Sequence, residues 1–181
     1  MTLNYSLTEN DFLQHQLFIA SKKASIKKQR IKTWLIYSGS MLLLSFLFYQ
    51  SGDKVMTYYF LIFGIVCLCF FQLYQKWYYK RYYRKFIAEN YKNRFGILAN
   101  INFTGEYIEM SDITGESKIN LTEIENTTET GDYFYLKMRT GGHLIIPKQK
   151  LEHVDQVRQE LKILCEKLSI DFLDDSKWRW K

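Results

Sequence analysis

The chain has 181 residues, of which 47% are hydrophobic and 17% aromatic, and its net charge is +6. This composition excludes a wholly disordered chain, and one proline with nine glycines excludes a collagen-like or low-complexity chain. Three cysteines, at positions 67, 69 and 165, are too few and too scattered for the disulfide framework of a small secreted domain.

Residues 1–32 are expected to form a cytoplasmic arm made of a short strand, an amphipathic helix and a basic segment. Residues 3–7 alternate like a strand, and Thr8 followed by Asp11 resembles a capping box that opens a helix. The apolar stripe that follows predicts a helix that either docks on the C-terminal domain or lies along the membrane. The residues leave both placements open.

Residues 33–75 predict a transmembrane hairpin with spans at about 33–50 and 55–74. At 1.5 Å per residue, the two runs reach about 27 and 30 Å, which matches a hydrocarbon core of about 30 Å. Apolar side chains cover every face of both runs, whereas a surface helix of a soluble protein has one apolar stripe. Only Ser51–Lys54 joins the two spans, so they are expected to be antiparallel.

Two basic segments flank the spans and contain no acid, so together they carry +11 while all other residues sum to −5. Their members are Lys22, Lys23, Lys27, Lys28, Arg30, Lys32, Lys76, Lys80, Arg81, Arg84 and Lys85. The positive-inside rule therefore predicts a multi-pass protein of the cell (inner) membrane with both termini in the cytoplasm. The same side chains are candidates for binding anionic lipid.

Aromatic residues at the ends of the spans are expected to lie at the membrane interface. They are Trp34, Tyr37, Tyr49, Tyr74, Trp77 and Tyr78. Residues 76–94 interleave aromatics with bases and predict a juxtamembrane helix, although such a pattern also occurs where RNA bases stack. Because residues 95–181 hold 11 bases and 15 acids, we expect no nucleic-acid partner.

The cytoplasmic domain over residues 95–181 is expected to be α+β. Runs with a period of two predict strands at 97–103, 106–111, 116–121, 133–138 and 143–146, which form an antiparallel sheet or open barrel. The apolar residues from 151 to 168 recur at helical spacing and predict a C-terminal helix that caps this sheet. His143 and His153 have no paired ligand or nucleophile nearby in this arrangement.

Two features near the C-terminus remain open. Asp171, Asp174 and Asp175 are expected to form a solvated acidic turn, with a cation site as the alternative. The tail Trp178–Lys181 either returns to the membrane interface or packs against the domain.

The strand and turn motifs resemble those of the YcxB-like proteins of bacterial membranes. The resemblance rests on 115–119 (GESKI), 121–124 (LTEI), 132–136 (DYFYL) and 145–148 (IIPK), and on two spans that precede them. It implies a pleckstrin-homology-like fold and a bacterial inner-membrane setting. It implies no activity, because the family has none assigned.

No nucleophile, phosphate-loop or metal-ligand motif is present in the sequence, so no catalytic residue, cofactor or metal is expected. We interpret the chain as a non-catalytic, membrane-tethered binding or regulatory module whose partners are the lipid bilayer and another membrane or cytoplasmic protein. The alternative is an accessory subunit of a transporter or membrane enzyme that uses small residues of the spans, Ser38, Gly39, Ser45 and Gly64. A homo-oligomer is compatible with both.

Overall fold

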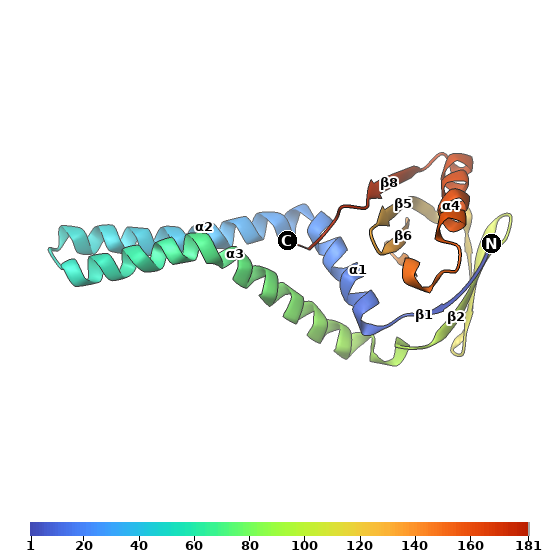
Figure 1. Cartoon of the computed structure of the whole chain (residues 1–181), viewed down its shortest axis with the longest axis horizontal. Coiled ribbons are helices and arrows are strands. Elements are labelled where there is room, and N and C mark those ends of the chain that lie inside the picture. Colours follow the sequence, from blue (N-terminus) through green and yellow to red (C-terminus); the bar gives the residue numbers. More distant parts are fainter. Residues whose placement is uncertain (181) are drawn as a thin grey trace. The chain divides into compact units, whose positions relative to one another are not determined.

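The computed structural model describes residues 1–180, and the chain forms two compact units (Figure 1). The first unit, here called the β domain, contains Met1–His15 and Ile87–Arg179. The second, here called the helical unit, contains Gln16–Phe86 together with Trp180. The chain therefore begins in the β domain, leaves it at His15 and returns at Ile87.

Two long helices, α2 (Ala24–Gln50) and α3 (Lys54–Asn90), form an antiparallel hairpin (Figure 1). Gly52, in the turn between them, has a φ of +80°, which glycine adopts without steric cost. The shorter helix α1 (Glu9–Lys22) precedes α2, and Lys23 interrupts the helical backbone between them with an extended conformation. We call Lys23 the elbow.

Both hairpin helices are long and apolar enough to cross a membrane. Only 11% of the most apolar window of α2 and 6% of that of α3 are buried, whereas a core helix of a soluble protein hides most of its apolar surface. Leu43, Ile62 and Phe70 illustrate this, since each exposes more than half of its surface. Such exposure in water is unfavourable, which favours a lipid environment.

The first sheet of the β domain has the order β1-β2-β3-β4, and all of its pairs are antiparallel. Its strands are β1 (Thr2–Ser6), β2 (Leu98–Phe103), β3 (Tyr107–Asp112) and β4 (Gly115–Asn120). The pair β1–β2 joins residues on either side of the helical unit, with Leu3 opposite Ile101. The arm therefore docks on the domain through its strand, so this compact unit is larger than the 95–181 expected from sequence.

The second sheet has the order β7-β6-β5-β8. Its strands are β5 (Ile124–Thr130), β6 (Tyr133–Met138), β7 (His143–Pro147) and β8 (Asp171–Asp175). Helix α4 (Val154–Leu168) follows β7 and contributes Val157 and Leu161 to a core shared with both sheets. Short 3-10 helices occur at η1 (Lys92–Arg94), η2 (Leu121–Glu123) and η3 (Lys148–Lys150).

The α+β class and the helix after the sheets confirm the sequence prediction, but two strands were missed. β5 was not predicted because its sequence, IENTTET, is polar, although Thr127–Thr130 are all buried. The acidic turn expected at Asp171–Asp175 is instead β8, which pairs in parallel with β5, so the sheet is not wholly antiparallel. Within residues 1–180, no three His, Cys, Asp or Glu side chains lie close enough to hold a metal ion.

Candidate binding groove

A groove of about 670 Å³ opens in the β domain between the first sheet and β7. Ile101, Met110 and Leu144 supply apolar walls from β2, β3 and β7. Arg94 of η1 and Glu116 of β4 add opposite charges to the lining. Ligand sites are typically concave, mostly apolar and about 300–1,000 Å³, with a few polar groups that orient the ligand, so the groove has the dimensions of a binding site.

Tyr5 makes one wall of this groove rigid. Its ring belongs to the core, and its hydroxyl donates a hydrogen bond of 2.6 Å to the carbonyl of Ile145 in β7. Burial raises the pKa of the Tyr5 hydroxyl well above its usual range. The hydroxyl is therefore a permanent donor that links the N-terminal strand to the second sheet.

Two histidines meet beside the groove. The ring centroids of His143, which lines the groove, and His15 of α1 lie 4.9 Å apart, and Tyr135 lies 5.3 Å from His15. Burial, and then the charge of His143, lower the pKa of His15 to about 3. Burial, and then Lys137, lower the pKa of His143 as well. Both rings are therefore uncharged at neutral pH. His143, for which no paired ligand or nucleophile was expected nearby, thus lies beside a second imidazole.

Asp11 is the polar centre of the docked arm. The Thr8 backbone N–H donates to Asp11 Oδ2 at 2.8 Å, and the Asp11 backbone N–H donates to Thr8 Oγ1 at 3.4 Å, which confirms the predicted capping box. Asp11 also accepts from the Tyr133 hydroxyl at 2.9 Å and from Lys150 Nζ at 3.1 Å. Burial alone would raise the pKa of Asp11, but these hydrogen bonds outweigh it and hold the pKa below its usual value. The carboxylate therefore stays ionised and serves the fold.

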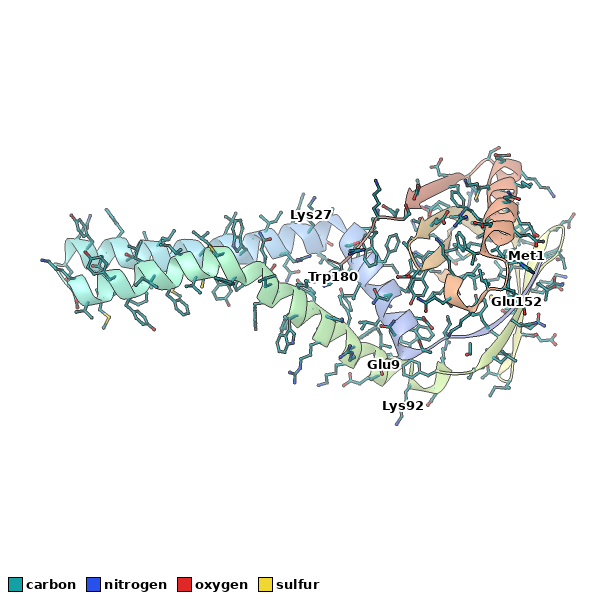
Figure 2. The ribbon with its side chains drawn as sticks, in the orientation of Figure 1. Met1, Glu9, Lys27, Lys92, Glu152 and Trp180 are labelled. Atoms are coloured by element: carbon teal, nitrogen blue, oxygen red, sulfur yellow. The ribbon has the colours of Figure 1, made fainter. Side chains whose placement is uncertain are left out.

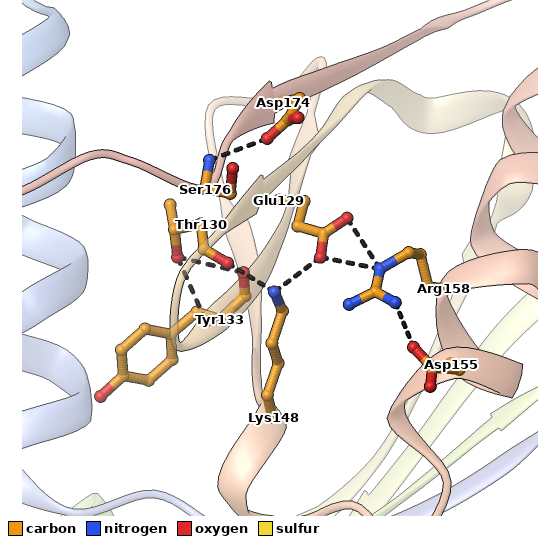
Figure 3. Close-up of polar contacts among 8 residues, drawn as sticks. All are labelled: Glu129, Thr130, Tyr133, Lys148, Asp155, Arg158, Asp174 and Ser176. Carbon is orange, nitrogen blue, oxygen red and sulfur yellow. Dashed lines mark hydrogen bonds and ion pairs between the residues drawn. The ribbon is translucent and has the colours of Figure 1, made fainter.

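Glu129 of β5 is the centre of a second buried network (Figure 3). Lys148 Nζ donates to one carboxylate oxygen at 2.6 Å, and Arg158 Nε donates to both oxygens at 2.8 and 3.1 Å. Lys148 also donates to the Thr130 carbonyl at 2.5 Å, and Arg158 contacts Asp155. Two cations thus compensate one buried carboxylate, which fixes α4 and η3 to the centre of the sheet.

The predicted interfacial aromatics all lie on α2 and α3. Tyr37, Tyr49, Tyr74, Trp77 and Tyr78 each expose at least half of their surface. Trp34 is partly buried instead and donates its indole N–H to the Leu68 carbonyl at 3.2 Å. Trp34 therefore joins the two hairpin helices, and the place of all six rings at a bilayer interface stays a prediction.

The hairpin brings its two basic segments to the same end. The Gln75 side-chain amide donates to the Arg30 carbonyl at 3.0 Å, and Arg30 Nε donates back to Gln75 Oε1 at 3.5 Å. These contacts join the helices where the two basic segments, residues 22–32 and 76–85, adjoin the spans, so both segments lie toward the open end of the hairpin. Their role in topology stays a prediction.

The C-terminal tail contacts the hairpin helices through Trp180. Trp180 is labelled in Figure 2. Its indole N–H donates to the Lys76 carbonyl at 3.2 Å, and the Arg30 guanidinium lies 5.1 Å from its ring. Tyr79 makes an edge contact at 6.3 Å between ring centroids. The tail therefore packs on the open end of the hairpin through Trp180, and Lys181 lies outside the described residues.

Most of the small residues proposed for an intermolecular helix contact are used inside the hairpin. Ser38 and Ser45 are buried, and Ser45 Oγ donates to the Thr57 carbonyl at 2.9 Å. A Cβ on Gly64 would lie 2.9 Å from a side-chain carbon of Leu42. Gly39 differs, because nothing lies within 4 Å of the position where its Cβ would be.

Sequence reasoning missed the groove and the histidine pair. Their residues come from segments on both sides of the helical unit, so no local spacing brings them together. One local signal was present, since His15 follows Asp11 by four residues on the buried face of α1. A titratable residue on such a face indicates a buried partner.

The family model described as YcxB-like protein matches residues 103–161, which extend from the end of β2 into α4. No curated protein and no solved structure matches the chain. The match covers the motifs on which the resemblance was based and includes β3 to β7, the centre of the β domain. Two helices long and apolar enough to cross a membrane precede it. The chain thus carries a YcxB-like domain behind a pair of membrane-type helices.

Proposed function

We propose that this chain is a non-catalytic, membrane-tethered module that presents the groove of its β domain to another protein on the cytoplasmic side of a bacterial inner membrane. The lipid bilayer is its first partner, and a membrane or cytoplasmic protein is its second. Tethering raises the effective concentration of the groove for other proteins at the same surface, so a weak interface suffices.

The observation that carries this proposal is the pairing of β1 with β2. These strands lie on opposite sides of the hairpin in sequence but in one sheet of the fold. Both ends of the hairpin therefore lead into the same domain, which requires them to emerge on one side of a bilayer. The basic segments adjoin both ends, and the positive-inside rule assigns that side to the cytoplasm.

The polar clusters of the domain support binding over catalysis. Glu129 is neutralised by Lys148 and Arg158, and Asp11 is hydrogen-bonded to Tyr133 and Lys150. General acid-base chemistry at neutral pH needs a group that titrates there, whereas Asp11 and His15 have pKa values shifted below that range. These side chains stabilise the fold of the β domain.

Photocrosslinking in intact membranes tests the proposal. A photoreactive residue at Glu116 faces the groove, and one at Gln159, exposed on α4, serves as a control on the same domain. A third, at Gly39, probes the open outer position of α2. We expect one protein to crosslink from position 116 and to be absent from the adducts of position 159.

Crosslinking of a protein only from position 39 would support the accessory-subunit alternative and contradict the groove. Capture of the same proteins from positions 116 and 159 would show unspecific contact and would contradict it as well. Extraction of the membranes with alkaline carbonate tests the tether separately, because an integral hairpin stays in the membrane fraction.

A further inference from the structure

A second cavity lies in the helical unit at the elbow between α1 and α2. It has a volume of about 210 Å³ and is lined by Ile19 of α1, Ile26 of α2 and Phe86 of α3. Lys23 and the adjacent pair Tyr82 and Tyr83 add polar groups to the same lining. The extended backbone of Lys23 directs α1 away from the line of α2 and so leaves this space beside α3.

The helices around this cavity carry far more positive than negative charge. Between Gln16 and Phe86 the chain contains 12 lysines and arginines but a single acid, Asp53. Asp53 and Lys54 lie at the closed end of the hairpin, so the other 11 bases lie toward the open end, where the first acid along α3 is Glu89, three residues beyond Phe86. Lys23 is exposed there. Lys27, labelled in Figure 2, is exposed as well. An excess of cations around a concave site attracts and retains an anion.

The position of the cavity along the helices identifies the part of a lipid that can reach it. Tyr82 is eight residues beyond Tyr74, where the apolar run ends, which corresponds to about 12 Å along the helix axis. The headgroup layer adds about 5–8 Å on each side of the hydrocarbon core. Flexible lysine side chains bridge the difference, so phosphates rather than acyl chains are within reach.

We infer that this elbow cavity binds the phosphate-bearing headgroup of an anionic phospholipid, with Lys23 contacting the phosphate and the ring edges of Tyr82 and Tyr83 forming the wall. This inference rests on the membrane tether of the proposed function and adds a specific lipid site to it. The site differs from diffuse surface attraction because it is a defined cavity with one lysine in its lining.

Native mass spectrometry of the full chain tests this inference. The chain is reconstituted in nanodiscs with equal amounts of phosphatidylglycerol and phosphatidylcholine, released, and examined for retained lipid. We expect one phosphatidylglycerol to be retained in preference to phosphatidylcholine. Lys23→Gln should lower this retention about fivefold, the usual effect of one lysine near an anionic surface. Lys23→Arg should preserve it.

Lys54→Gln is the matched control, because it removes the same charge at the closed end of the hairpin. Equal losses in Lys23→Gln and Lys54→Gln would overturn the inference in favour of diffuse attraction, and so would equal retention of the two lipids. Displacement of the lipid by millimolar glycerol 1-phosphate would identify a soluble phosphate as the ligand and would also overturn it. A chain that leaves the membrane on carbonate extraction contradicts the tether, whereas one that stays but shows no lipid preference contradicts only the elbow site.

Discussion

Acid should release the N-terminal arm from the β domain, because His15 is buried without charge. Its pKa is about 3 in the folded chain and about 6.5 when unfolded, so the unfolded chain binds more protons between these values. Stability from this residue is complete above pH 6.5 and falls as the pH falls toward 3. At pH 5, which is about 1.5 pH units below the pKa of the unfolded chain, protonation of His15 in the unfolded state lowers the free energy of unfolding by about 2 kcal/mol.

Hydrogen exchange of the β1 amides measures this loss directly. After correction for the intrinsic pH dependence of exchange, opening of β1 should be about 30-fold more frequent at pH 5 than at pH 7.5. His15→Phe removes the titrating group and keeps an aromatic ring against His143 and Tyr135, so its difference between the two pH values should be much smaller.

His153→Phe is the control, since His153 is exposed at the start of α4 and should leave the acid dependence unchanged. The reasoning is refuted if His15→Phe retains the full acid dependence of the unmodified chain. It is also refuted if exchange of β1 slows at pH 5.

Three further substitutions test the packing. Glu129→Gln should lower the free energy of unfolding by about 3 kcal/mol, because it leaves the largely buried Lys148 without its carboxylate partner and removes one of the two carboxylate partners of Arg158. Glu125→Gln, in an exposed ion pair, should change the free energy of unfolding by less than about 0.5 kcal/mol, and urea titration compares the two variants. Gly64→Val should destabilise the hairpin by about 1–3 kcal/mol in micelles, as measured by the circular dichroism of the helices on heating. An unchanged melting curve would show that the helices are not in contact at Gly64. Gly39→Val is the control, because the space around Gly39 is open and the substitution should have little effect. Ser169→Gly should raise the unfolding free energy by about 0.5 kcal/mol, because Ser169 ends α4 with a φ of +54°, and a lower denaturation midpoint would contradict this account.

The elements that the sequence predicted correctly are those whose residues follow a local pattern. The spans of the hairpin helices, at about 33–50 and 55–74, are almost wholly apolar, and α4 repeats its apolar residues at helical spacing. β3 and β4 are separated by the Thr114-Gly115 turn signal. Each of these patterns extends over about 20 residues or fewer, so it can be recognised in a single sequence.

β5 was unpredictable for the opposite reason. Polar residues are normally found at the surface, yet Thr127, Glu129 and Thr130 are buried at the centre of the second sheet. Their burial is tolerated because Glu129 has two cationic partners and Thr130 is hydrogen-bonded to the Tyr133 carbonyl. Those partners come from other elements, so the sequence of β5 alone indicates an exposed loop.

The N-terminal strand β1 shows that the boundary of the β domain also depends on long-range pairing. β1 covers one edge of β2, places Leu3 and Tyr5 in the core and bonds to β7 through the Tyr5 hydroxyl. The matched family segment begins at residue 103, the last residue of β2, so it contains no part of β1. Without residues 1–15, β2 would present unpaired amides and carbonyls beside an opened core, which is the usual template for strand-mediated association. The N-terminal strand is therefore part of the domain rather than an extension of the membrane helices, and only the long-range pairing across the hairpin reveals it.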